Sequence, residues 1–200
     1  MARVRAYVGL GANVGDAAAT LADAVRALAA APGLRLRGVS RLYATAPVGV
    51  LDQPEFRNAV VALDVVVAPD ASPSAAASEL LVVLKDIERA FGRQQRERWG
   101  PREVDLDLLV FGRHAISFER PEAGRSANPA KAALPLTVPH TEARHRLFVL
   151  APLADLAPRL VPPGWDETVL AAADRQRAAE GDAAARAVAA WSGEGWRPLG

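Results

Sequence analysis

The sequence contains no cysteine among its 200 residues. This absence excludes disulfide bonds and thiolate metal ligands, and it is compatible with a reducing compartment. The chain also lacks an excess of either charge, because its 24 basic and 23 acidic residues leave a formal net charge of +1. A chain with so little net charge has no global field that would attract nucleic acid or anionic lipid. Any bound anion must therefore be held by a local cluster of side chains.

Long apolar runs are missing as well. Segments such as 60–63 and 65–68 are much shorter than the roughly 20 residues that a membrane-spanning helix needs. The N-terminal sequence MARVRAYVGL has no apolar core of the kind found in secretory signals. Half of the residues are nevertheless hydrophobic and 24% are charged, a balance typical of soluble globular proteins. We therefore expect a soluble cytoplasmic protein that acts on neither membranes nor nucleic acid.

Hydrophobic periodicity predicts a chain in which strands and helices alternate. Asp16 is expected to cap the first helix, and Ser72 followed by Pro73 marks the start of the second. The expected elements are strands at 3–10, 34–43, 56–67 and 104–111, and helices at 17–31, 73–91 and 148–156. The first six in chain order give β-α-β-β-α-β. This order is typical of ferredoxin-like α+β folds, in which helices cover an antiparallel-rich sheet.

The length and composition predict one domain followed by a smaller segment. Residues 1–162 are expected to form the domain, which contains a polar insertion at 119–135. Residues 163–200 form an alanine-rich C-terminal extension with two tryptophans near its end.

A glycine-rich segment follows the first predicted strand. Gly9, Gly11 and Gly15 have a spacing close to that of dinucleotide-binding loops. A nicotinamide-dependent reductase would continue with a parallel strand that ends in an acidic residue, but the next strand carries Arg35 and Arg37 and a hairpin-like pair follows. A tight turn that lets the backbone approach a ligand or another strand is therefore favoured. The chain also has no Walker A sequence, so ATP would need another mode of binding.

Asp105 and Asp107 form the most informative pair in the chain. Residues two apart on a strand point to the same face, roughly 6.6 Å apart along it, whereas Val104, Leu106 and Leu108 are expected to be buried on the other face. Two neighbouring carboxylates on a core strand repel each other and are hard to desolvate without a cation. Oxygen ligands at this spacing suit Mg²⁺, which takes carboxylates together with phosphate oxygens and water. An edge strand with a solvated acidic face is the structural alternative.

The loop before this strand carries the opposite charge. Within residues 93–102 the only acid is Glu97, and the basic residues are Arg93, Arg96, Arg98 and Arg102. Guanidinium groups bind phosphate oxygens bidentately, so this loop next to two strand aspartates favours phosphoryl transfer. A solvated loop, or a nucleic-acid-binding module in which Trp99 stacks on bases, would have the same composition.

Two further groups of residues suggest ligand contacts. His140 lies among basic residues that include Arg146, which indicates a second phosphate-binding patch, although a lone histidine is more often structural. Phe56 and Asn58 alternate on one strand face. An aromatic ring beside an amide suits a flat heterocycle, but most strand phenylalanines are simply part of a core.

Taken together, these segments resemble the hydroxymethyldihydropterin pyrophosphokinase family over roughly residues 4–160. The similar segments are YVGLGANVGD, TAPVGVLDQPEFRNAVVAL, IERAFGR, RWGPREVDLDLLVFG and LTVPHTEARHRLFVLAPLADLAP. RWGPR followed by DLD is the most specific of them. The resemblance implies an enzyme of folate synthesis, in which the hydroxyl of 6-hydroxymethyl-7,8-dihydropterin attacks the β-phosphorus of ATP and AMP leaves.

The resemblance also implies roles for individual residues. Asp105 and Asp107 would hold two Mg²⁺ ions that bridge the phosphates of ATP, and the catalytic residues would be Arg98, Arg102, Asp105 and Asp107. The nucleotide would contact Glu88, Arg93, Trp99, His140 and Arg146. The pterin would contact Thr45, Ala46, Val48, Phe56, Asn58, Asp105 and Phe148, and it would stack between the two phenylalanine rings. The two substrates would be the binding partners of a monomer.

The sequence departs from the family pattern at three places. Gln95 stands where the family often has an arginine, and Phe56 replaces a common tyrosine. Pro135 occupies the position before LTVPH at which an arginine is often found. The resemblance leaves Arg125 and Lys131, both in the insertion, as candidates to replace that arginine.

Overall fold

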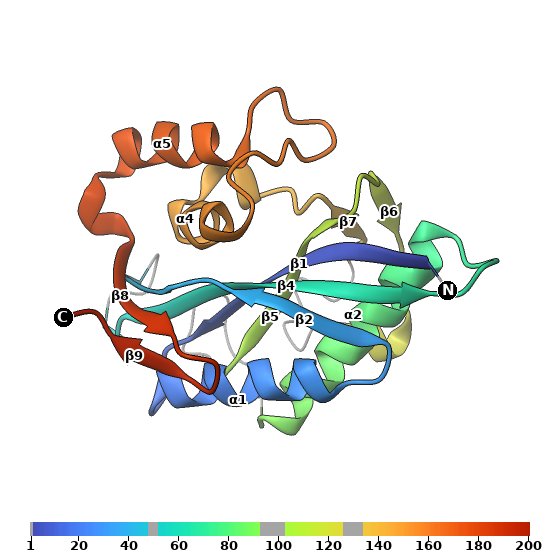
Figure 1. Cartoon of the computed structure of the whole chain (residues 1–200), viewed down its shortest axis with the longest axis horizontal. Helices are drawn as coiled ribbons and strands as arrows, with labels where there is room; N and C mark the ends of the chain where they lie inside the picture. Colours follow the sequence, from blue (N-terminus) through green and yellow to red (C-terminus); the bar gives the residue numbers. More distant parts are fainter. Residues whose placement is uncertain (1, 48–51, 93–102, 126–133) are drawn as a thin grey trace.

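The structure, a computed structural model, describes residues 2–47, 52–92, 103–125 and 134–200. Within these residues the chain has an α+β fold in which helices lie on both faces of a sheet (Figure 1). All of the strand pairs in the described residues are antiparallel. The predicted fold class is confirmed.

The large sheet has the strand order β5-β1-β4-β3-β8-β9, with β2 also paired to β4. Its strands are β1 (Ala2–Ala12), β2 (Leu34–Val39), β3 (Leu42–Thr45), β4 (Phe56–Val67), β5 (Asp105–Phe111), β8 (Arg186–Trp191) and β9 (Trp196–Pro198). The helices are α1 (Ala17–Ala30), α2 (Pro73–Ala90), α4 (Leu147–Leu156) and α5 (Val169–Glu180), with short 3-10 turns η1 (Glu122–Gly124), η2 (Ala143–His145) and η3 (Asp182–Ala184). A separate small sheet pairs β6 (Ile116–Phe118) with β7 (Leu136–Val138).

Two helices begin at the residues that the sequence predicts. The side chain of Asp16 accepts a hydrogen bond from the backbone N–H of Ala19 at 3.0 Å. Ser72 does the same for Ala75 at 3.1 Å, and proline occupies the first turn of α2. These side chains satisfy N–H groups that have no partner within the helix, so each cap sets the start of its helix.

The strand predicted at 34–43 is wrong in one respect, because the structure divides it into β2 and β3. Both strands pair with β4, but the pairing is interrupted at Ser40. There the hydroxyl of Ser40, rather than a backbone carbonyl, accepts the N–H of Val60 at 2.9 Å. The next N–H, of Arg41, donates to Asp155 in α4 at 3.0 Å. The backbone N–H of Ser40 still donates to the carbonyl of Val60 at 2.9 Å, so one bond of the ladder remains at the break and side-chain oxygens accept the N–H groups of Val60 and Arg41.

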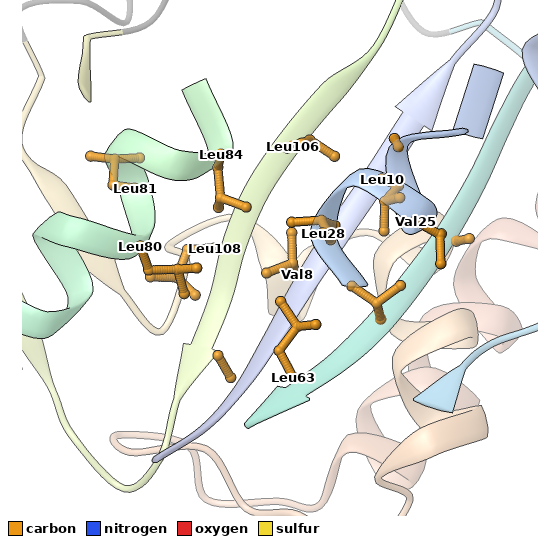
Figure 2. Close-up of a cluster of buried hydrophobic side chains, with 14 of the residues drawn as sticks. Val8, Leu10, Val25, Leu28, Leu63, Leu80, Leu81, Leu84, Leu106 and Leu108 are labelled. Atoms are coloured by element: carbon orange, nitrogen blue, oxygen red, sulfur yellow. The ribbon is translucent and has the colours of Figure 1, made fainter. Parts of the chain in front are cut away.

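Strand alternation divides the core between the two faces of the sheet. On one face, side chains of β1, β4 and β5 pack against α1 and α2. Figure 2 shows Val8 of β1 near Leu28 of α1, and Leu106 of β5 near Leu84 of α2. On the opposite face lie α4 and α5 (Figure 1).

The second core lies between α4, α5 and the sheet. Tyr7 of β1, Val60 of β4 and Leu109 of β5 pack there against Leu150 of α4 and Val169 of α5. Because β1, β4 and β5 each supply residues to both cores, the middle of the sheet is buried on both faces. The candidate site lies on the α4 face, next to this second core.

Residues 163–200, predicted as an extension, belong to the same sheet and the same second core. Helix α5 packs against α4, and β8 pairs with β3. Trp191 and Trp196 meet edge to face with ring centroids 4.8 Å apart. The indole N–H of Trp196 donates to the carbonyl of Ser40 at 3.0 Å. The C-terminal hairpin thus continues the sheet beyond β3.

In the part of the chain that the structure describes, none of the helices combines the length and apolar character needed to cross a membrane.

Candidate active site

A pocket opens on the α4 face of the sheet, where β1, β3, β4 and β5 lie side by side. Nine of the residues predicted for the site line it: Thr45, Ala46, Phe56, Asn58, Asp105, Asp107, His140, Arg146 and Phe148. Of the other predicted residues, Glu88 lies elsewhere, and Val48, Arg93, Arg98, Trp99 and Arg102 lie outside the described residues.

Strand β5 presents the two aspartates to this pocket. Leu106 and Leu108 are 0% and 1% exposed in the core with α2, as predicted, so Asp105 and Asp107 point to the other face. Their neighbours in β1 are Gly11 and Gly9, opposite Asp105 and Asp107 respectively. A Cβ added at Gly11 would lie 3.1 Å from the side-chain oxygen of Asn58. Gly9 and Gly11 therefore lie within β1 rather than in the tight turn that the sequence predicted, and without side chains they leave the floor of the pocket open.

Asn58 is held in one orientation at the bottom of the pocket. Its amide Nδ2 donates to the hydroxyl of Thr45 at 2.8 Å, and the two side chains are buried. The pairing of β3 with β4 places Thr45 opposite Phe56, and Asn58 lies two residues further along β4, on the same face. An amide fixed in this way presents a defined pattern of donors and acceptors to any ligand in the pocket.

Two phenylalanines stand at the sides of the pocket. Phe56 is the first residue of β4, and Phe148 lies in the first turn of α4. Both side chains are half-buried. The guanidinium of Arg146 lies 5.8 Å from the ring centroid of Phe148, within the range of a cation–π contact.

The segment after β7 brings a histidine to the end of β5. The backbone N–H of His140 donates to the carbonyl of Leu109 at 2.9 Å. Its ring Nδ1 accepts the N–H of Glu142 at 3.3 Å, so in the neutral ring the hydrogen is on Nε2. The guanidinium of Arg146 is paired with the carboxylate of Glu142 at 3.3 Å. Glu142 therefore contacts Arg146 through its side chain and the ring of His140 through its backbone N–H.

Glu88 does not line the pocket. Its side chain is 2% exposed and lies on the α2 side of β5, where it accepts the backbone N–H of Leu106 at 2.7 Å. Lys85, one turn earlier in α2, is 2.6 Å from the same carboxylate and donates to the carbonyl of Leu106 at 2.9 Å. This buried ion pair thus binds both peptide groups of the residue between the two aspartates. Lys85 was not predicted, because its contacts depend on where α2 packs.

Arg120 is a second functional candidate that the sequence prediction misses. It lies just after β6 and donates to the carbonyl of Leu134 at 3.0 Å. Burial lowers the pKa of Arg120, whereas the charges of Asp107 and Glu88 act in the opposite direction. The half-buried guanidinium of Arg120 is thus within electrostatic range of Asp107, although it is not among the residues that line the pocket. Arg120 lies at the start of the insertion predicted at 119–135, whereas the candidates named from the sequence, Arg125 and Lys131, lie further along it.

The two aspartates fit a hard cation. Among the described residues there is no cluster of three or more histidine, aspartate or glutamate side chains that could enclose a metal ion. Two carboxylates on one strand face instead match Mg²⁺, which commonly takes one or two carboxylates and completes its shell with phosphate oxygens and water. Carboxylates, basic side chains and two aromatic rings around one pocket define a site suited to phosphoryl transfer onto a flat heterocycle.

Comparison with known proteins gives the family. Residues 7–158 match the model of 7,8-dihydro-6-hydroxymethylpterin-pyrophosphokinase (HPPK). The chain belongs to this family. It is similar to the 2-amino-4-hydroxy-6-hydroxymethyldihydropteridine pyrophosphokinase of Methylorubrum extorquens, with 44% identity over 82% of this chain and 89% of the relative. The enzyme of that name from Pseudomonas aeruginosa is 40% identical over 80% of this chain and 84% of its own length.

Solved structures show the same fold. A wild-type Plasmodium falciparum HPPK-DHPS crystallised with pteroate superposes with a TM-score of 0.70 at 16% identity, over 99% of this chain and 48% of the other. An HPPK-DHPS in complex with substrates gives a TM-score of 0.71 at 12% identity, over 100% of this chain and 48% of the other. The chain therefore spans about half the length of these structures.

Proposed function

We propose that this chain transfers the pyrophosphoryl group of ATP to the hydroxyl of 6-hydroxymethyl-7,8-dihydropterin, giving AMP and the pterin diphosphate in folate biosynthesis. The family and the names of the relatives support this reaction. The observation that carries it is the shared pocket, in which Asp105 and Asp107 lie with Phe56, Asn58 and Phe148. A metal-binding edge and a heterocycle-binding side within one cavity are what this reaction requires.

The pterin is proposed to occupy the part of the pocket between Phe56 and Phe148. Two half-buried rings stack on a flat heterocycle and exclude water from its faces. The edge of the pterin would meet Asn58, whose amide is oriented by Thr45, and the carboxylate of Asp105. Backbone groups near Ala46 and Val48 complete this subsite in the proposal.

The phosphates of ATP are proposed to lie toward Asp107, His140, Arg146 and Arg120. Asp105 and Asp107 would hold Mg²⁺, two ions by the family resemblance, and when bound these ions neutralise phosphate charge. Arg93, Arg98, Trp99 and Arg102 are proposed to complete this subsite, with Arg98 and Arg102 acting in catalysis. The buried contacts of Glu88 with Leu106 and Lys85 favour a role in supporting β5 rather than in contacting the nucleotide.

The chemistry is a displacement at the β-phosphorus. The pterin hydroxyl oxygen forms a bond to the β-phosphorus and loses its proton to water, the bond from the β-phosphorus to the oxygen of the α-phosphate breaks, and AMP leaves with that electron pair. No covalent bond to the protein is needed, so the side chains act by holding the two reactants in line and by stabilising negative charge. His140 and Arg146 supply positive or hydrogen-bonding groups at the phosphate end.

A coupled assay tests the function. Purified protein should form AMP from ATP only when hydroxymethyldihydropterin and Mg²⁺ are both present. Asp105→Asn and Asp107→Asn should each reduce turnover about 100-fold or more, because loss of a metal ligand removes several kcal/mol of charge stabilisation. Asp174→Asn, in an exposed ion pair on α5, is the matched control and should retain activity. AMP formation that is independent of the pterin, or full activity in either strand variant, would contradict the proposal.

The remaining properties are proposed from the sequence. A cytoplasmic monomer that binds neither nucleic acid nor membranes agrees with the absence of cysteine and with the net charge of +1. Light scattering during size-exclusion chromatography should give the mass of one chain, 21.1 kDa. A mass of twice this value would contradict the monomer.

A further inference from the structure

The last residue of α5 caps the helix that carries Phe148. The carboxylate of Glu180 accepts the backbone N–H of Leu147, the first residue of α4, at 3.2 Å. α4 has no side-chain cap of its own, because its N-cap residue is Arg146. A carboxylate is favourable at the N-terminus of a helix and unfavourable at the C-terminus of its own helix. Glu180 is therefore placed to stabilise α4 rather than α5, and Gln176 holds it there with a bond of 2.7 Å.

Six residues further on, the chain reaches the other aromatic wall. Arg186, the first residue of β8, donates to Glu55 at 3.0 Å, and Glu55 directly precedes Phe56. Arg57, on the other side of Phe56, pairs with the same carboxylate at 3.2 Å. The hydrogen bond from Arg186 is the main reason that the pKa of Glu55 is lowered from its ordinary value. These contacts therefore link the start of β8 to the residues on both sides of Phe56.

Between Glu180 and Arg186, residues 181–183 are exposed, whereas Ala185 packs between α4 and β3. Ala185 is buried together with Tyr43 of β3 and Leu147 and Ala151 of α4. Immediately afterwards β8 pairs with β3, with Arg186 opposite Ala44. The small side chain of Ala185 allows the chain to pass closely between the helix that carries Phe148 and the strand that leads to Thr45.

We propose that residues 180–186 position the two aromatic walls of the pterin subsite, with Glu180 holding the segment of Phe148 and Arg186 holding the segment of Phe56. The inference rests on the proposed function, and it assigns to the C-terminal extension a role in pterin affinity. Glu180 and Arg186 are positioning residues, because both act through a neighbouring residue rather than on the substrate. Their loss changes the spacing of the rings and leaves Asp105, Asp107 and His140 in place.

The experiment compares Glu180→Gln, Arg186→Gln and the double variant with wild type. Calorimetry measures binding of 6-hydroxymethylpterin in the presence of α,β-methylene ATP and Mg²⁺, and separately the binding of the nucleotide analogue. Each single variant should weaken pterin binding about threefold, as expected for one helix-terminal charge or one exposed ion pair, and the double variant about tenfold. Steady-state kinetics should show this loss in the KM for pterin, with kcat and the KM for ATP within about twofold of wild type.

Two further variants serve as controls. Asp174→Asn removes an ion pair on the exposed surface of α5, 2.9 Å from Arg177, and should leave pterin binding unchanged. Arg186→Lys keeps the positive charge opposite Glu55 and should recover most of the affinity lost in Arg186→Gln.

The outcomes separate the inference from the function on which it rests. A wild-type protein that does not bind the pterin contradicts the proposed function. Wild-type affinity in the double variant, with a functional wild type, overturns the positioning role. An equal loss of pterin and nucleotide binding, accompanied by a lower Tm, also overturns it, because such a result reflects general destabilisation.

Discussion

The carboxylate of Glu88 accepts the backbone N–H of Leu106 at 2.7 Å, from the side of β5 opposite to the pocket. Lys85 completes the contact by donating to the carbonyl of the same residue at 2.9 Å. β5 is at the end of the strand order, next to β1, so this ion pair takes the place that a further strand would occupy. It thereby holds the backbone between Asp105 and Asp107 along the free edge of β5.

The buried ion pair between Lys85 and Glu88 should contribute strongly to the stability of the fold. Lys85→Met should lower the free energy of unfolding by about 3 kcal/mol or more, because it leaves the charge of Glu88 in a site that is 2% exposed. The matched control is Asp86→Asn, which removes the exposed pair with Arg89 at the same i,i+3 spacing in α2 and should cost less than about 1 kcal/mol. Urea denaturation measures both. If the two variants lost similar amounts of unfolding free energy, burial would not make the Lys85–Glu88 pair stronger than the exposed Asp86–Arg89 pair.

Asn58 should determine pterin affinity without affecting the nucleotide. Asn58→Ala removes the amide that Thr45 orients, and it should weaken pterin binding by about 1–3 kcal/mol, because ligand groups are left without partners. Binding of α,β-methylene ATP should stay within about twofold of wild type, since the phosphates are proposed to lie toward Asp107 and His140. Calorimetry with each ligand tests this. An equal loss for both ligands would mean that the two subsites are not separate.

Arg120 should act on the nucleotide side. Arg120→Gln should lower kcat/KM for ATP roughly 10- to 150-fold, since hydrogen bonds to charged groups contribute about 1.5–3 kcal/mol. Arg113→Gln, at an exposed position of the preceding turn, provides the control. If Arg125→Gln or Lys131→Gln reduced activity while Arg120→Gln did not, the functional cation would be one of these later residues of the insertion and not Arg120.

Tyr43 should make stability depend on alkaline pH. Burial, and then the negative charge of Asp155, raise the pKa of Tyr43 above its ordinary value. The folded state therefore keeps the phenol neutral while the unfolded chain ionises near about pH 10. The contribution of this group is fully present below that pH and is lost as the pH rises through the higher folded pKa.

Tyr43→Phe tests this dependence. The variant loses the hydrogen bonds to Asp155 at 3.0 and 3.1 Å, which should cost about 1 kcal/mol at neutral pH. Its free energy of unfolding should then fall less steeply than that of wild type between about pH 9 and 11. Urea denaturation across this range is the measurement. Parallel curves for the two proteins would show that Tyr43 does not titrate differently in the two states.

The features that could be predicted from sequence are local. The alternation of β5 places Asp105 and Asp107 on one face because side chains in a strand alternate, whatever lies around it. Asp16 and Ser72 cap their helices because a cap contacts only the next turn. The family motifs extended this reasoning to nine residues that do line one pocket.

The prediction failed where a contact joins distant segments. The strand expected at 34–43 is interrupted because Ser40 meets Val60 and Arg41 meets Asp155, more than a hundred residues away. Arg120 was not among the predicted site residues, because the charge of Asp107 acts on it only once β7 has packed against β5. The nucleotide contact of Glu88 stays a prediction, and the packing of α2 turns its carboxylate onto the backbone N–H of Leu106.

Strand and helix periodicity depends on near neighbours, so the fold class and the residues of β4 and β5 that face the pocket could be predicted from the sequence, and the resemblance of its motifs indicated the family. Tertiary packing alone brings the C-terminal extension into the sheet beside β3 and Arg186 to Glu55, 131 residues earlier in the chain. It also decided that Lys85 and Glu88 close the edge of β5. These contacts depend on the packing of whole elements, and no local pattern encodes which distant carboxylate a given basic side chain will meet.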